Sequence, residues 1–270
     1  IRKNATAGME NRKPVVIQAH LDMVPQKNAD KVHDFTKDAI EAYVDGDWVK
    51  ANGTTLGADN GIGMASALAI LGSDDIKHGP LEVLLTVDEE AGMTGAFGVE
   101  AGMLQAEILI NTDSEQEGEI YMGCAGGVDA EFTVPVQWQA VSDGVSAFSL
   151  SLTGLKGGHS GVNIHLGRGN ANKLLARFLA DNAAVLNLAL AGFNGGSLRN
   201  AIPREATVSL TVPATKLSQL QQRVAEFEAL LRQELAAVEP ALKLSLTEQP
   251  LPQKVLTSAT QQTLINLLNV

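Results

Sequence analysis

The chain has 270 residues, of which 45% are hydrophobic and 19% are charged. This length and composition are typical of one large or two ordinary globular domains with a hydrophobic core. The formal net charge of −11 argues against a nucleic-acid backbone or an anionic membrane surface as partner. The same excess of carboxylates favours the binding of divalent cations.

The single cysteine, Cys124, leaves no internal disulfide pair, so we expect a cytoplasmic protein and a small buried side chain at this position. No signal peptide is visible, and the longest apolar stretch, GMASALAILG, is too short to span a bilayer. The chain begins at Ile1 and stops at Val270 inside an apolar, helix-like segment. We therefore expect it to be a piece of a longer protein.

The first half of the chain alternates short apolar runs with glycine-rich turns and one helix. The runs PVVIQAH, LEVLLTVDEE and AEILINTDSE predict strands, and the last two end in carboxylates. IEAYVDGDWVKANG predicts a hairpin turned at Asp45 and Gly46, and NGIGMASALAILGS predicts a helix. Continuous apolar strands that alternate with helices predict a mainly parallel α/β sheet covered on both faces.

The pattern changes after GCAGG, so we predict a first domain over residues 1–126 and a second over 127–270. In the second, AFSLSLTG, NLALAGF, ATVSLTVPA and LKLSLTE predict strands. A helix is expected over about 170–181, and a long amphipathic helix over about 216–238. The resulting order, β-α-β-β-α-β, is the ferredoxin-like pattern of an α+β domain.

Acidic residues and one histidine gather where the predicted strands of the first domain end. They are His20, Asp22, Asp59, Glu89, Glu90 and Asp113. Ligands of open α/β sheets bind outside the carboxyl ends of the strands, and one histidine with several carboxylates suits a Zn²⁺ or Mn²⁺ pair. Each acid alone is ordinarily a turn residue or a helix cap, and Asp59 could be the N-cap of the following helix. Their gathering at one sheet edge favours a metal site.

Five motifs stand in the order and approximate spacing of the M20 metallopeptidases, and the sequence resembles this family, in particular its dipeptidases, over essentially its whole length. They are HLDMVP, GADNGIG, DEEAGMTG, NTDSE and GGHSG. The resemblance implies two divalent ions, most simply zinc, with manganese or cobalt also suited. It implies that His20 and Asp113 bind one ion, that Glu90 binds the other, and that Asp59 bridges them.

The resemblance also assigns roles to residues beside the ligands. It implies that Asp22 orients the ring of His20, and that Glu89 is the general base that takes a proton from the attacking water. It further implies a cis peptide bond between Asp59 and Asn60.

By the same resemblance, the first domain is catalytic and the second is a lid that also serves for dimerisation. His159 in GLKGGHSGVNIH would stabilise the oxyanion, and Arg199 and Asn200 of GSLRNAIP would contact the substrate. Without the resemblance, Arg199 is an ordinary surface residue, and a structural role for His165 is at least as good. The apolar stripe of the long helix covers the lid's own sheet, and we expect the lid to be the self-association surface.

The function that the resemblance implies is metal-dependent hydrolysis of unblocked dipeptides, including those that end in histidine, such as carnosine. One alternative is an aminoacylase or carboxypeptidase of the same family, and another is a non-catalytic binding protein on the same fold. NTDSEQEGEIYMGCAGG resembles the dipeptidases, and the presence of Glu89 argues against a non-catalytic protein. We expect a homodimer formed through the lid.

The family pattern requires a further histidine on the second ion, which the resemblance places in a segment that follows the lid. His33 and His78 lie outside the motifs, and we expect both to be surface residues. We therefore expect the chain alone to lack this ligand, to hold about one ion tightly and to be inactive. We also expect an unpaired sheet edge or an open apolar face on the first domain.

Overall fold

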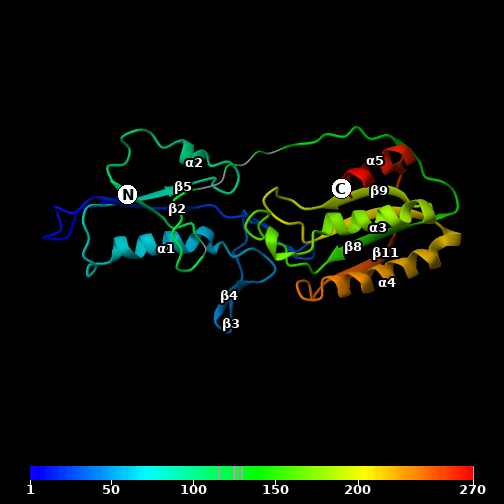
Figure 1. Ribbon diagram of the computed structural model, residues 1–270, viewed down its shortest axis with the longest axis horizontal. Helices are drawn as coiled ribbons and strands as arrows, with labels where there is room; N and C mark the ends of the chain where they lie inside the picture. The colour runs from blue at the N-terminus through cyan, green and yellow to red at the C-terminus, as the bar shows by residue number, and fades with distance from the viewer. Residues whose placement is uncertain (115, 124–125, 127, 129, 270) are drawn as a thin grey trace. The chain divides into compact units, whose positions relative to one another are not determined.

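The computed structural model describes residues 1–114, 116–123, 126, 128 and 130–269. It divides into two compact units, Ile1–Val128 and Asp129–Val270 (Figure 1). Cys124 lies outside the described residues, so its expected burial remains a prediction. Of the helices that the structure describes, none combines the length and the apolar character needed to cross a bilayer.

The first unit is built on a four-stranded sheet in the order β1-β5-β2-β6. Its strands are β1 (Arg2–Lys3), β5 (Leu81–Thr86), β2 (Val15–His20) and β6 (Ile108–Asn111). The central strand β2 runs parallel to both β5 and β6, whereas the short β1 runs antiparallel to β5. The predicted mainly parallel sheet is therefore confirmed, and the carboxyl ends of three strands lie at the same edge.

A helix and a hairpin complete the parts of this unit that bear on the site. Helix α1 (Ala58–Gly72) packs on β2, and its Ala67 is fully buried. Gly63 is required there, because a Cβ at this position would stand 2.2 Å from Thr112 Oγ1. The predicted hairpin consists of β3 (Ala42–Asp45) and β4 (Trp48–Ala51), and the short helix α2 (Thr94–Phe97) follows β5.

The outer strand β6 is not covered as the sequence predicts. Ile108, Leu109 and Ile110 are 43%, 56% and 49% exposed, although their run is as apolar as that of β2. Among the described residues β6 is the last strand of the sheet, beside β2, whereas α1 packs on the central strand β2. The expectation of two covered faces is thus wrong at β6 within the described residues, and the expected open apolar face is present.

The second unit has the predicted ferredoxin-like order. Its elements in chain order are β8 (Val145–Thr153), α3 (Ala171–Leu186), β9 (Ala189–Gly195), β10 (Ala206–Pro213), α4 (Leu217–Glu234) and β11 (Lys243–Gln249). The four strands form an antiparallel sheet in the order β11-β8-β10-β9. Helices α3 and α4 contact each other as well as the sheet, so both cover the same face (Figure 1).

Smaller elements complete the described part of the unit. They are β7 (Trp138–Ala140), β12 (Lys254–Leu256), which pairs with β7, the 3₁₀ turn η1 (Ile164–Leu166) and α5 (Ser258–Leu268). A second 3₁₀ turn, η2 (Ala214–Lys216), precedes α4.

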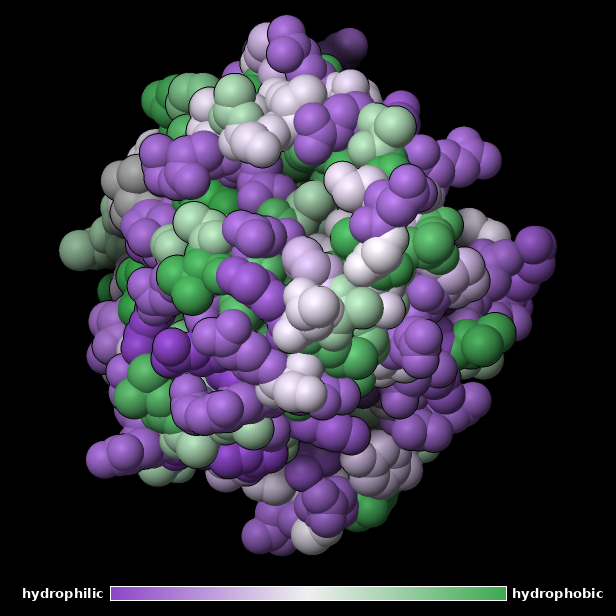
Figure 2. All heavy atoms as spheres, turned by 90° about the vertical axis from the view of Figure 1, so that its right-hand side faces the viewer, coloured by the Kyte–Doolittle hydropathy of each residue, from purple (hydrophilic) through white to green (hydrophobic). Residues whose placement is uncertain are grey.

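The apolar stripe of α4 lies in the core of the second unit. Leu220, Val224, Phe227 and Leu231 are buried, and the ring of Phe227 lies 5.4 Å from that of Phe178 on α3. The stripe therefore covers the unit's own sheet, and self-association through this unit stays a prediction. On the face of the molecule shown in Figure 2, hydrophobic residues are dispersed among hydrophilic ones.

Candidate metal centre

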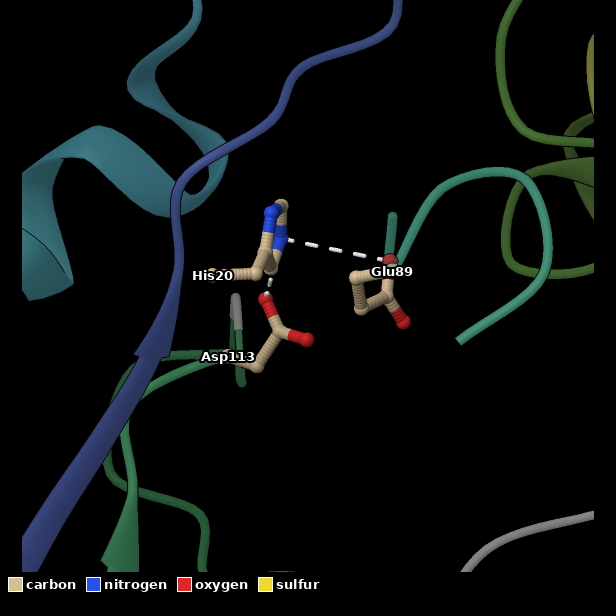
Figure 3. A group of neighbouring side chains, drawn as sticks. All are labelled: His20, Glu89 and Asp113. Atoms are coloured by element: carbon tan, nitrogen blue, oxygen red, sulfur yellow. Dashed lines mark ion pairs between the residues drawn. The ribbon is translucent and has the colours of Figure 1, made fainter. Parts of the chain in front are cut away.

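The candidate site is assembled at the carboxyl ends of β2, β5 and β6, around a buried histidine. His20 ends β2 and is only 2% exposed. Its Nε2 lies 3.1 Å from Asp59 Oδ1, 3.3 Å from Asp113 Oδ1 and 3.9 Å from a carboxylate oxygen of Glu89. The side chains of His20, Glu89 and Asp113, from three separate strand ends, converge on one point (Figure 3).

In the part of the chain that the structure describes, two overlapping groups of side chains have the spacing of metal ligands. In each group the donor atoms lie within 4.8 Å of one another. One group is His20, Glu89 and Asp113, and the other is His20, Asp59 and Glu90. One imidazole nitrogen with several carboxylate oxygens is a donor set that Zn²⁺ and Mn²⁺ accept. The residues present therefore fit a divalent ion, and both groups depend on the same histidine.

Asp22 contacts both the histidine and the acidic pair. Its backbone carbonyl accepts from His20 Nδ1 at 2.9 Å, and its carboxylate lies 3.5 Å from the same nitrogen. Because a carbonyl oxygen can only accept, Nδ1 carries the proton and Nε2 presents its lone pair to the site. The two oxygens of the Asp22 carboxylate also accept from the backbone amides of Glu89 and Glu90, both at 3.1 Å.

The side chain of Asn60, for which the sequence predicts no role, contacts another candidate ligand. Its amide donates to Asp113 Oδ1 at 2.5 Å and accepts from Thr112 Oγ1, and the residue is 2% exposed. The peptide bond between Asp59 and Asn60 is cis, as predicted. Asp59 does not hold the N-cap position of α1, which is Gly57, and its non-helical backbone angles mark a kink in the first turn. Its side chain contacts His20 instead.

The site has more carboxylates than cationic groups, so its carboxylates repel one another. Burial, with the nearby charges of Asp59 and Glu89, raises the pKa of Glu90 to about 7. Burial and the Asp113 carboxylate likewise raise the pKa values of Asp59 and Glu89. A divalent cation would remove this repulsion between carboxylates.

At two other residues of the site, His20 and Asp22, the surroundings favour the charged form. Burial alone would lower the pKa of His20, but the charge of Asp113 and the hydrogen bond to Asp59 outweigh it and raise that pKa. Burial would raise the pKa of Asp22, but the amides of Glu90 and Glu89 outweigh it, so Asp22 is held as an anion.

In the second unit, the structure brings together the residues expected to contact substrate. The exposed ring of His159 accepts at Nδ1 from the backbone amides of Gly161 and Val162, at 3.0 and 3.1 Å. Its neutral form therefore carries the proton on Nε2 and can donate from there. The neighbouring Ser160 pairs with the segment of Arg199 and Asn200, whose carbonyls accept from its hydroxyl and its amide.

The remaining histidines differ from one another in their surroundings. His33, expected at the surface, is 7% exposed, and its ring packs edge-on against Phe35 with centroids 4.5 Å apart. That expectation is wrong, because the loop around His33 folds back on itself, with Lys27 Nζ donating to the His33 carbonyl. His78 is half-buried and donates to the Gly79 carbonyl, and His165 is exposed in η1.

Comparison with known proteins supports a peptidase fold. Residues 150–239 match the M20 family model described as the peptidase dimerisation domain. Over 269 residues the chain is 61% identical to the cytosol non-specific dipeptidase of Escherichia coli (strain K12). This alignment covers all of the chain and 56% of that relative. A second relative, the uncharacterized protein YqjE of Bacillus subtilis (strain 168), is 30% identical over 112 residues, or 40% of the chain and 28% of that protein.

A solved structure extends the likeness to the fold. The crystal structure of aminoacylhistidine dipeptidase from Vibrio alginolyticus is 56% identical and superposes with a TM-score of 0.57. It is matched over 99% of this chain and 55% of its own, so the chain spans about half the length of these relatives. The resemblance to M20 metallopeptidases, and within them to the aminoacylhistidine and cytosol non-specific dipeptidases, is thereby confirmed.

Proposed function

We propose that the full-length protein is a metal-dependent dipeptidase, and that the first unit carries most of its catalytic site. The observation that carries this proposal is the convergence of one buried histidine and several carboxylates at the carboxyl edge of a parallel sheet. This arrangement belongs to hydrolytic metal sites rather than to sites of covalent catalysis.

His20, Asp59 and Asp113 would hold one divalent ion, and Asp59 with Glu90 would contribute to a second, with zinc as the natural occupant. His20 Nε2 faces Asp59 and Asp113 at 3.1 and 3.3 Å, which supports the first set. When bound, the ions supply Lewis-acid polarisation of the peptide carbonyl and lower the pKa of water. Asp22 keeps His20 in the tautomer that this ligation requires.

Glu89 would act as the general base, accepting a proton from the attacking water and passing it to the leaving amine. Burial and Asp113 raise its pKa, which suits a group that must both take and return a proton. The Nε2–H of His159 and the side chain of Asn200 would donate to the developing oxyanion. Arg199, exposed beside them, would pair with the substrate carboxylate.

The substrates would be unblocked dipeptides, including those that end in histidine. The names of two similar relatives, a non-specific dipeptidase and an aminoacylhistidine dipeptidase, support this class. The match of residues 150–239 to a dimerisation domain supports a homodimer formed through the second unit. The name of the Escherichia coli relative also supports a cytoplasmic location.

The test combines metal analysis with a substrate panel. Full-length protein loaded with zinc or manganese is assayed on unblocked dipeptides, N-acyl amino acids and peptides that end in glutamate. Cleavage confined to dipeptides, together with bound metal, supports the proposal. Preference for N-acyl substrates would instead indicate an aminoacylase, and bound metal without turnover on any substrate would indicate a non-catalytic protein.

A further inference from the structure

A buried carboxylate closes the loop that carries His159. Glu239 follows α4 and is 2% exposed. Its Oε2 accepts from the backbone amide of Lys156 at 2.8 Å, and its Oε1 accepts from that of Gly169 at 2.9 Å. These amides stand at the two ends of the loop 156–169, so one side chain joins both ends. Burying a carboxylate is costly unless it is hydrogen-bonded, which both oxygens are.

The glycines of the loop permit many backbone conformations, so hydrogen bonds are needed to hold it in one of them. Gly157, Gly158 and Gly167 all have positive φ angles, of 67°, 135° and 65°. A Cβ at Gly158 would lie 2.8 Å from Asn163 Oδ1, so a larger residue could not replace it. Glycines give the unfolded loop many conformations, and hydrogen bonds at its ends must offset the entropy lost on ordering it.

Within this loop, hydrogen bonds between residues close in sequence determine the orientation and tautomer of the His159 ring. The amide of His159 donates to Asn163 Oδ1 at 2.9 Å, while the ring Nδ1 accepts from the amides of Gly161 and Val162. These bonds form in the backbone conformation of the loop whose ends Glu239 joins, while the amide of Ile202 donates to the Gly158 carbonyl and that of Ser160 to the Asn200 carbonyl. We propose that Glu239 is a positioning residue, whose bridge between Lys156 and Gly169 keeps the His159 ring oriented with its proton on Nε2.

The bridge requires two acceptor oxygens at this position. A glutamine would have the same shape but only one acceptor oxygen, and its NH₂ group would face the second backbone amide. Glu239→Gln therefore opens one end of the loop with little change of volume. Glu234→Gln is the matched control, because Glu234 ends α4, pairs with Arg177 at 2.8 Å and is 40% exposed.

The test reads the ring itself, so it does not depend on turnover. The chain has five histidines, and ¹⁵N spectra of their rings separate the two tautomers of each. Near pH 8, where an imidazole is ordinarily neutral, His159 of the wild type should show a protonated Nε2 and an unprotonated Nδ1. Glu239→Gln should move both signals toward the average of two tautomers, and Glu234→Gln should leave them unchanged. The signals are assigned with His159→Gln.

An unchanged His159 ring in a folded Glu239→Gln variant would overturn the proposal. If that variant does not fold, amide exchange in the wild type decides. Lys156 and Gly169 amides protected within about tenfold of those of β8 support the bridge, whereas exchange at the rate of open amides refutes it.

The kinetic consequence rests on the function proposed above. In the full-length enzyme Glu239→Gln should lower kcat on the order of tenfold with KM little changed, because a displaced donor weakens transition-state binding. A wild type without turnover would count against the proposed function alone, since the ring signals of His159 are still measured. An altered ring with an unchanged kcat would count against the role of His159 in catalysis.

Discussion

The substitution Asp22→Asn tests how the first site is held together. In the structure, the Asp22 carboxylate accepts from the amides of both Glu89 and Glu90 at 3.1 Å, while the His20 contact uses its backbone carbonyl. Asparagine keeps the carbonyl and the shape, but it offers one acceptor oxygen for the two amides. The change should therefore leave His20 in place and release one residue of the acidic pair.

The size of the effect follows from the bond that is lost. A hydrogen bond to a charged group contributes about 1.5–3 kcal/mol, and about 1.4 kcal/mol corresponds to a tenfold change in affinity. Partners behind metal ligands typically change metal affinity by about 10- to 100-fold, which is the same range. Each of the two groups of candidate ligands includes one residue of this pair, Glu89 or Glu90, so we expect zinc binding by the chain to weaken by that factor in Asp22→Asn.

The assay is competition for zinc between the 270-residue chain and a chromophoric chelator, followed by calorimetry at one pH. Asp45→Asn is the control, because Asp45 lies in the β3–β4 hairpin, pairs with Lys50 at 2.6 Å and loses the same charge. Asp22→Asn that binds zinc within twofold of both wild type and control would refute the assigned role. Equal weakening in both variants would indicate a general effect of net charge instead.

Three further results are expected. In the full-length protein, Glu89→Gln should keep its metal and lose nearly all turnover, because an amide cannot accept the proton of water, whereas Glu90→Gln should lose one metal. Elemental analysis and a dipeptide assay measure both properties, and equal loss of metal in the two variants would contradict the prediction. The pKa of Glu90 rises from 4.5 to about 7, so its contribution to the stability of the metal-free fold is present below 4.5 and is lost as pH rises through 7; melting temperatures should fall across this window without zinc, and much less with it. Phe178→Ala, at a fully buried position of the second unit, should lower the free energy of unfolding by about 3–5 kcal/mol in urea titrations, and a loss below about 1 kcal/mol would contradict the packing described.

Much of the fold follows from local features of the sequence. Apolar runs, alternation and the Asp45–Gly46 turn predict β2, the β3–β4 hairpin and the β-α-β-β-α-β order, all of which the structure contains. Helix ends are predicted less well, because α3 continues to Leu186 and α4 stops at Glu234. These elements are predictable because side-chain periodicity and turn chemistry act over a few residues.

The residues of the candidate site can likewise be predicted from short sequence motifs, but the contacts among them cannot. That His20, Asp59 and Asp113 face one another follows from strand ends that meet at one sheet edge. The sequence does not predict that the Asp22 carboxylate accepts from the amides of Glu89 and Glu90. Every residue except proline carries a backbone amide, and the sequence does not indicate which acceptor it binds.

Burial is the other property that only the tertiary structure decided. Ile110 on β6 is exposed and His33 is buried, against the hydropathy of each. The carboxylate of Glu239 is buried as well, although nothing near it in the sequence distinguishes it from the exposed Glu234. Residue type sets what burial would cost or contribute, while the neighbours that cover a side chain come from distant segments and are set by how the elements pack.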